Sequence, residues 1–507
     1  MITDMTKGSP LRHILMFSVP LLIGNIFQQL YNIADLVIVG RLLGVEPFAA
    51  VGAVAPLFFL ITFVIVGLTN GFAVVTGQRY GAKDIEGVKN SVVVSTILST
   101  VVTLLFSVVF ALLMNPVLHW MNVPTNIYHN AYWYVQIIVI GLIATTMYNM
   151  LSSIIRALGD SKTPLYFLII ASIVNIFLAL AFIQIFHMGV PGSAIAVILS
   201  QGISFILCWI YIKYKLPMLH LTKSDWKITD KKVFVKSAME HLRVGMPMAV
   251  QFSLIGISIL IIQSVCNTFG SDVIAALTAA LRIEQIATLP MMSFGVALAA
   301  YVAQNYGARK FKRIRLGVIK TSTINIVISL CMAVVMRFWG TDIIREFIGT
   351  ATPAIIEIAH RYLLISTVYY FFLGQIFIYR NALQGMGEAL FPLLACIAEL
   401  VMRSFAAVYL AIKFGYIGMF YSGPIAWIGA SSVLFVGYFY SIKHIIYNVK
   451  KNPIVSHLKN KKIYVRITTR IALMVKESLL CPHLLKILLH VKSLIPEEIL
   501  LLKLMLF

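Results

Sequence analysis

The sequence predicts an all-α, polytopic membrane protein with twelve transmembrane helices, and three observations support this. Of the 507 residues, 60% are hydrophobic and 12% are charged, whereas a water-soluble protein has about a quarter of its residues charged. Apolar stretches such as 92–114 and 163–186 are long enough to cross about 30 Å of hydrocarbon. The stretches are continuous and do not alternate with a period of two, which excludes an outer-membrane barrel.

Hydropathy and polar interruptions divide the chain into twelve expected spans. They lie near 14–39, 48–78, 90–114, 130–155, 164–186, 191–212, 244–267, 272–305, 316–338, 357–380, 390–412 and 419–441. Lys7 and Arg12 precede the first apolar run, which is too long for a signal-peptide core and has no small-residue cleavage site. We therefore interpret that run as a first membrane span and not as a cleaved signal.

The net charge of +22 is explained by membrane orientation. With a cytoplasmic N-terminus, 34 of the 41 Lys and Arg residues fall in inner loops, and Arg282 and Arg403 lie within the membrane. Those in or near outer loops are Arg41, Arg337, Arg345, Arg361 and Lys413. This is the positive-inside pattern, with both termini cytoplasmic in a cell (inner or plasma) membrane. The positive charge then contacts lipid headgroups, and we expect no nucleic-acid partner.

The sequence offers no sign of enzyme chemistry. The five cysteines Cys208, Cys266, Cys331, Cys396 and Cys481 stand alone without a Cys-x-x-Cys spacing, so we expect no metal site and no redox site. Phosphate-binding loops, His-Glu-x-x-His sites and nucleophile elbows are all missing from the sequence. We therefore expect no enzyme activity, no ATP use and no cofactor.

The chain is a duplication. Matching segments lie about 226 residues apart: 78–83 with 304–309, Pro20 with Pro247, Gly44 with Gly270, 156–160 with 382–385, and 189–192 with 415–418. We expect a first lobe over 1–212, a cytoplasmic linker over 213–243, a second lobe over 244–446 and a basic cytoplasmic tail over 447–507. Six spans separate the copies, so the two six-helix lobes have the same orientation, a recurrent transporter architecture.

Several motifs resemble the MATE (multidrug and toxic compound extrusion) family, in its bacterial branches that include the DNA-damage-inducible and staphylococcal multidrug types. They are the first-span run 30–35 with Val39-Gly40 and Leu43-Gly44, segment 78–82, segment 156–160, Asn175, Gly192 and their second-half counterparts. The resemblance covers about residues 8–445. It implies a two-lobed secondary multidrug efflux antiporter that exports organic cations in exchange for protons or sodium ions by alternating access.

A polar stripe in the first span contains the strongest site candidate. Asn25, Gln28, Gln29, Asn32 and Asp35 follow one helical stripe. We expect the stripe to line the cavity of the first lobe, with Gln28 and Asn32 in contact with substrate. Polar contacts that hold helices together are the alternative. Asp35 matches the family's first-span acid, which the resemblance implicates in cation coupling.

Asn175 in the fifth span is the second expected cation-coupling residue, because it matches a family asparagine. Its amide oxygen suits sodium coordination or a hydrogen bond to a protonated acid. Some relatives carry a second carboxylate one turn later, where this chain has Ala179. The choice between H⁺ and Na⁺ as the coupling ion therefore stays open.

In the second half, Glu284 matches an acid that the resemblance implicates in recognition of cationic substrates. The alternative is that Arg282 and Glu284 are charges at a helix end near water. Tyr369 and Tyr370 offer ring faces to a lipophilic cation, although packing is the commoner role of helix aromatics. Glu399 and Arg403 have the i, i+4 spacing of a structural ion pair; gating or substrate contact is the alternative.

Three further expectations concern the whole chain. The tail after Tyr447 is interpreted either as an amphipathic helix on anionic lipid or as an extension without a transport role. The partners are small lipophilic organic cations and membrane lipids, and we expect a monomer. The competing functions are a lipid-linked saccharide flippase, which needs more cavity cations than Arg282 and Arg403, and a polyprenyl-phosphate enzyme, which needs clustered acids.

Overall fold

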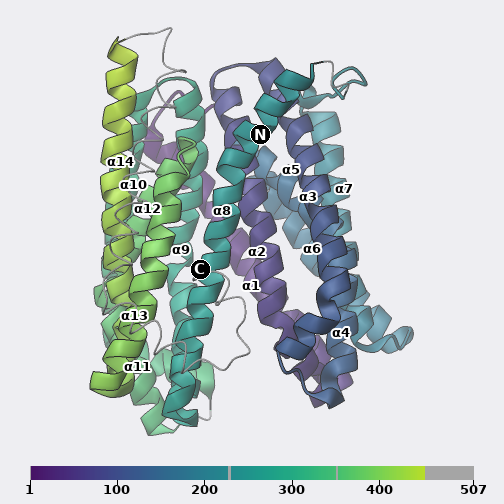
Figure 1. Cartoon of the computed structure of the whole chain (residues 1–507), viewed down its shortest axis with the longest axis vertical. Helices are drawn as coiled ribbons and strands as arrows, with labels where there is room; N and C mark the ends of the chain where they lie inside the picture. The colour runs from purple at the N-terminus through teal and green to yellow at the C-terminus, as the bar shows by residue number, and fades with distance from the viewer. Residues whose placement is uncertain (1, 227–229, 350–351, 452–507) are drawn as a thin grey trace. The chain divides into compact units, whose positions relative to one another are not determined.

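The computed structural model describes residues 2–226, 230–349 and 352–451, apart from the side chains of Asn32 and of 446–451. Within these residues the secondary structure is helical, as predicted (Figure 1). Most of the predicted basic tail, residues 452–507, lies outside the described part. Met1–Leu118 and Val123–Phe439 form one compact unit, which contains every site discussed below.

Residues 2–226 of the described structure form seven α-helices and one π-helix, besides one short 3₁₀ helix. They are α1 Pro10–Leu43, α2 Val45–Gly81, α3 Ile85–Trp120, α4 Thr125–Ile140, α5 Leu142–Ala157, α6 Lys162–Leu180, the π-helix η1 Ala181–Ile185 and α7 Gly189–Lys215. The short 3₁₀ helix η2, Pro217–Leu219, follows. Helix α1 continues α-helically through Pro20, and α2 through Pro56.

The second half repeats this order. Its elements are α8 Lys231–Cys266, the 3₁₀ helix η3 Asn267–Phe269, α9 Ser271–Gly307, α10 Phe311–Ile348, α11 Pro353–Val368, α12 Tyr370–Gly385, α13 Leu390–Phe420 and α14 Ser422–Lys451. Within α13, Gly415 has φ +62°, and the helix is kinked there. Glycine tolerates this backbone conformation because it has no β-carbon.

Two expected spans are broken helices. Helices α4 and α5 meet at Gly141 with a bend of 48°, and α11 and α12 meet at Tyr369 with a bend of 53°. Ten further helices in the described residues are long and apolar enough to cross a membrane, and each bent pair adds one span. The prediction of twelve transmembrane helices is confirmed.

The expected linker is shorter than the polar stretch of sequence. Helix α7 ends at Lys215 and α8 begins at Lys231, where the Asp230 carboxylate caps the helix by accepting from the amide of Lys232. Only 216–230 lies between the long helices. The remainder of the predicted 213–243 linker is helical, because polar residues at a membrane interface still form helix when a good N-cap precedes them.

The two halves pack through pseudo-equivalent helix pairs. Helix α2 packs along α8, and α1 packs along α9. A β-carbon built on Gly71 would overlap the α-carbon of Gly245, so the α2 and α8 backbones touch at a point where only glycine fits. Phe63 of α2 stacks on Phe252 of α8 at 5.7 Å.

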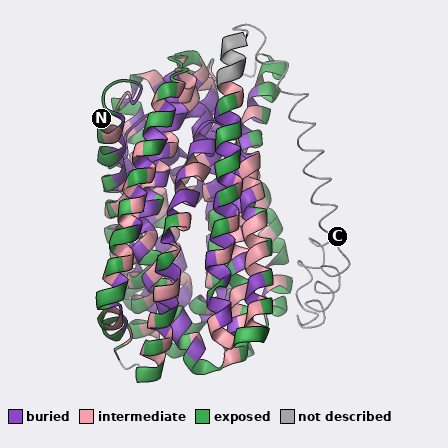
Figure 2. Ribbon diagram, turned by 90° about the vertical axis from the view of Figure 1, so that its left-hand side faces the viewer, coloured by how far each residue is buried: buried purple, intermediate pink, exposed green. Residues whose placement is uncertain are grey.

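Burial follows the pattern of a membrane bundle. Exposed residues run along the middle of the helices as well as their ends (Figure 2). On α3 the exposed side chains include Val101, Leu104, Leu105 and Leu112, whereas Ser95, Ser99 and Thr103 are buried. Large apolar side chains facing outward and small polar ones facing inward are typical of helices surrounded by lipid.

Candidate functional site: two buried polar clusters

Asp35 is buried inside the first half. Its carboxylate accepts a hydrogen bond from the Ser193 hydroxyl at 2.9 Å, and 7% of the residue is exposed. Helix α1 carries the acid, and the start of α7 carries the serine. Sequence reasoning identified Asp35 and missed Ser193, although the adjacent Gly192 was recognised as a family position.

Asn175 of α6 is fully buried, and neither its amide oxygen nor its amide nitrogen has a hydrogen-bond partner among the described residues. Buried polar atoms are normally paired, so an unpaired amide marks a place where an ion, water or moving side chain can bind. Helix α6 packs against both α1 and α7, which carry Asp35 and Ser193. No direct hydrogen bond between Asp35 and Asn175 occurs in the described structure.

The rest of the first-span stripe does not form one lining. The Asn25 amide donates to Ser293 of α9 at 3.1 Å, so this residue joins the two halves. Gln28 is exposed and Gln29 is half-buried. Asn32 lies in α1, but its side chain is outside the described part of the structure. Among the side chains of the stripe that the structure describes, only Asp35 is buried, and it contacts Ser193 within its own lobe.

Glu284 lies in an enclosed pocket of the second half. Its carboxylate accepts from the Tyr362 hydroxyl at 2.9 Å. The pocket has a volume of about 40 Å³ and is lined also by Arg403, Ser422 and Trp427. Drug-sized ligands occupy sites of about 300–1,000 Å³. In this conformation Glu284 therefore has no room beside it for such a ligand. Arg282, its neighbour in α9, is exposed.

Glu399 joins two arginines. Its carboxylate accepts from Arg403 at 2.6 Å and from Arg380 of α12 at 3.2 Å. All three side chains are at most 14% exposed. Arg380 was not identified from the sequence, because it lies at the end of an expected span, where a basic residue is ordinary.

The two candidate tyrosines differ in environment. Tyr370 is fully buried and packs against Trp427, with 6.2 Å between ring centroids. It therefore belongs to the interior of the second half. Tyr369 is half-buried and stacks on Phe372 at 6.5 Å.

The two clusters occupy corresponding places in the repeat. Tyr362 in α11 matches Tyr134 in α4, and Arg403 in α13 matches Asn175 in α6. Tyr134 is buried as well. The acid of the first cluster, Asp35, comes from α1, and that of the second cluster, Glu284, comes from α9.

Comparisons with known proteins agree with this architecture. The MatE family model matches residues 20–181 and 247–410, one segment in each half. Two relatives come from Bacillus subtilis: "Probable multidrug resistance protein YpnP" is 31% identical over 76% of this chain and 85% of its own, and "Probable multidrug resistance protein YoeA" is 28% identical over 76% and 84%.

A solved structure has the same fold. The outward-facing conformation of a multidrug resistance MATE family transporter of the MOP superfamily superposes with a TM-score of 0.80, at 24% identity, over 87% of this chain and 98% of that one. The helices are duplicated, and the family model matches a segment in each half. The chain therefore belongs to the MatE family, whose members are membrane transporters and not enzymes.

Proposed function

We propose that this chain is a multidrug efflux antiporter that exports lipophilic organic cations from the cell in exchange for protons or sodium ions. The observation that carries the proposal is Asp35, an acid buried within a membrane bundle against a single hydroxyl donor. An intramembrane carboxylate is costly to insert and usually marks an ion pathway. The names of two relatives, each a "Probable multidrug resistance protein", support drug efflux.

Asp35 is proposed to bind the coupling ion, and Ser193 to orient the carboxylate. The hydroxyl can donate to the ionised acid, or turn and accept from the protonated acid, so the pair tolerates both states. Such a pair can take up a proton or sodium ion on one side of the membrane and release it on the other.

Asn175 is proposed to complete the ion site. Its unpaired amide offers both a donor and an acceptor, and its helix packs against the helices of Asp35 and Ser193. A sodium ion would use the amide oxygen, whereas a protonated Asp35 could use either atom.

Glu284 is proposed to contribute to substrate recognition from the second half. Because its pocket is small here, substrate contact requires Tyr362 and Arg403 to move away from the acid. Tyr369 and Gln28 are proposed contacts as well, since both side chains are at least partly accessible. The protein is proposed to act as a monomer, with both termini on the cytoplasmic side.

The test is efflux of a cationic dye from vesicles that contain the purified protein, with a proton gradient or a sodium gradient imposed separately. Efflux driven by one gradient and abolished by its collapse supports antiport and identifies the ion. Dye movement that is independent of both gradients contradicts antiport. Translocation of lipid-linked saccharide without dye efflux would support the flippase alternative.

A further inference from the structure

We propose that Gln78 and Gln304 form a reciprocal clasp that closes the gap between the two halves at the end of the molecule where the N-terminal segment lies. The proposal rests on the alternating access proposed above. It assigns the gate on one side to two glutamines in the repeated motif.

The first half of the clasp runs from α2 to the second lobe. The Gln78 amide donates to the carbonyl oxygen of Gly385 at 2.9 Å, at the C-terminal end of α12. This carbonyl has lost its helical partner because the helix ends there. The glutamine therefore satisfies a group that would otherwise need water.

The second half of the clasp runs in the opposite direction. The Gln304 amide nitrogen donates to the carbonyl oxygen of Ala157 at 2.9 Å, at the end of α5. Its amide oxygen accepts from the backbone N–H of Met5 at 2.9 Å. Gln304 is fully buried, so breaking these bonds without replacement leaves unpaired polar groups away from water.

The two bonds are related by the internal repeat. Gln78 and Gln304 hold the same position in the motif, and Ala157 and Gly385 are each the last residue of the helix that the glutamine contacts. A β-carbon built on Gly81 would overlap the carbonyl oxygen of Gln304, and one built on Gly307 would overlap that of Gln78. The motif glycines thus permit the close approach that the glutamines need.

The N-terminal segment reinforces the closure. Asn305 donates to the carbonyl oxygen of Met5 at 3.2 Å, and Arg313 donates to the carbonyl oxygens of Met5, Lys7 and Gly8 at 2.9–3.0 Å. Met5 is buried. Residues that precede the first helix therefore cross to the second half and cover the Gln304 side of the clasp.

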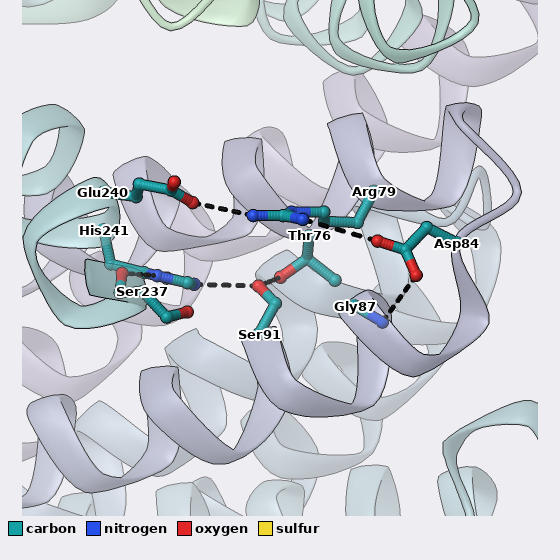
Figure 3. A network of polar contacts seen from close by, with 8 residues as sticks. All are labelled: Thr76, Arg79, Asp84, Gly87, Ser91, Ser237, Glu240 and His241. Atoms are coloured by element: carbon teal, nitrogen blue, oxygen red, sulfur yellow. Dashed lines mark hydrogen bonds and ion pairs between the residues drawn. The ribbon is translucent and has the colours of Figure 1, made fainter. Parts of the chain in front are cut away.

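A neighbouring network also joins the halves (Figure 3). Arg79 of α2 pairs with Glu240 of α8 at 2.7 Å, and the Ser91 hydroxyl contacts His241 at 2.8 Å. The Arg79 and Glu240 side chains are 39% and 38% exposed. Exposed ion pairs contribute little, so we assign the closure mainly to the amides of Gln78 and of the buried Gln304. Substitution of Arg79, which breaks this ion pair, therefore serves as the control for substitution of the two glutamines.

The first test locks the clasp. A β-carbon on Gly77 would lie 3.2 Å from that of Ala303, close to the separation in a disulfide. Gly77→Cys with Ala303→Cys is made in a chain whose native cysteines are replaced. We expect oxidation to reduce efflux at least tenfold, reduction to restore it, and dye binding to persist. Each single-cysteine variant should be insensitive to oxidation.

Unchanged efflux with complete crosslinking overturns the gate. If the cysteine-free parent and both single-cysteine variants fold and bind dye but transport nothing, the proposed antiport is at fault and not the clasp.

The second test opens the clasp and does not depend on transport. Gln78→Ala with Gln304→Ala should raise at least fivefold the rate at which a water-soluble maleimide labels a single cysteine placed at the buried Ala303. Arg79→Ala should change this rate less than twofold. Equal labelling in the double variant and the parent, with both proteins folded, would refute the clasp.

Discussion

Asp35 is the residue whose role is most sharply testable. Asp35→Asn keeps the size and the acceptor for Ser193 but removes the charge that we propose binds the ion. We expect gradient-driven efflux to fall at least a hundredfold while dye affinity changes less than threefold. Coupled ion flux and dye binding are measured in parallel in reconstituted vesicles. Ser193→Ala should give a smaller loss, and normal coupling in Asp35→Asn would transfer the ion-binding role to Glu284.

Glu284 offers a second prediction at this scale. Glu284→Gln keeps an acceptor for the Tyr362 hydroxyl and removes the negative charge that attracts a cation. We expect efflux of cationic dyes to weaken about tenfold, with unchanged expression and folding, and Tyr362→Phe to weaken it less. The measurement compares the parent and the variants in their transport of a divalent cation, a monovalent cation and a neutral substrate. If efflux of every cation is unaffected, Glu284 is not part of the substrate site.

The sequence identified single acids better than their surroundings. Asp35 and Glu284 could be found because charges inside an apolar run are rare and costly. Their partners Ser193 and Tyr362 could not, because a serine or tyrosine in a membrane helix is common and the contacts join residues far apart in the chain. Likewise, the spacing of Glu399 and Arg403 indicated one pair, whereas Arg380 reaches Glu399 only through the packing of α12 on α13.

At the scale of helices, continuous hydropathy located all twelve spans but not the breaks within two of them. The pairs α4–α5 and α11–α12 each form one apolar run, and the bend falls at Gly141 or Tyr369, not at a proline. Gly141 leaves room for Ile198, whose side chain would overlap a β-carbon there. At Gly141 the bend therefore accompanies a tertiary contact that no local pattern records.

The turn between α5 and α6 supplies a stability prediction. Asp160 is buried, and its carboxylate accepts from the Thr163 hydroxyl at 2.7 Å, the Tyr211 hydroxyl at 2.8 Å and the amides of Lys162 and Thr163 at 3.1 Å. Burial acts to raise the pKa of Asp160, but these hydrogen bonds outweigh it and hold the pKa below its ordinary value of 3.8. The ionised carboxylate therefore stabilises the folded protein.

Because the folded pKa is lowered, this stabilisation is present above about pH 4 and is lost as the pH falls through the lower folded value. Asp160→Asn should lower stability by about 1 kcal/mol at pH 7, because hydrogen bonds to a charged acceptor contribute more than those to a neutral one. Its difference from the parent should shrink below pH 4. Thermal unfolding in detergent measures both effects, with the exposed Asp342→Asn as control. A difference that does not depend on pH would contradict a role for the charge.

At the scale of the molecule, the repeat predicted two equivalent lobes but not which surfaces join them. The repeat does not distinguish a contact within one lobe from a contact between lobes. In both cases the contacting residues appear twice in the sequence, about 226 residues apart. Glycines quoted only as motif positions, Gly81 and Gly307, prove to be points of contact between the halves. The same duplication that made the family recognisable therefore also builds the interface across which the halves meet.

The orientation of the whole molecule is the last prediction. The N-terminal segment contacts Gln304 and Arg313, so the basic turns after α2 and α9 lie at the same end as the N-terminus. The positive-inside rule predicts that this end faces the cytoplasm. In a chain whose native cysteines are replaced, a cysteine at the exposed Ser224, between α7 and α8, should react with an impermeant maleimide only after cells are permeabilised.

A cysteine at the exposed Asn126, near the start of α4, should react in intact cells. An odd number of spans, the three helices α1, α2 and α3, lies between it and the N-terminus, so it lies on the opposite side of the membrane. The reversed labelling pattern would place the basic end outside. It would also put the Gln78–Gln304 clasp on the outer surface. Closing the clasp would then block the release of substrate to the outside, and not the entry of substrate from the cytoplasm. Orientation thus decides which half of the transport cycle the clasp controls.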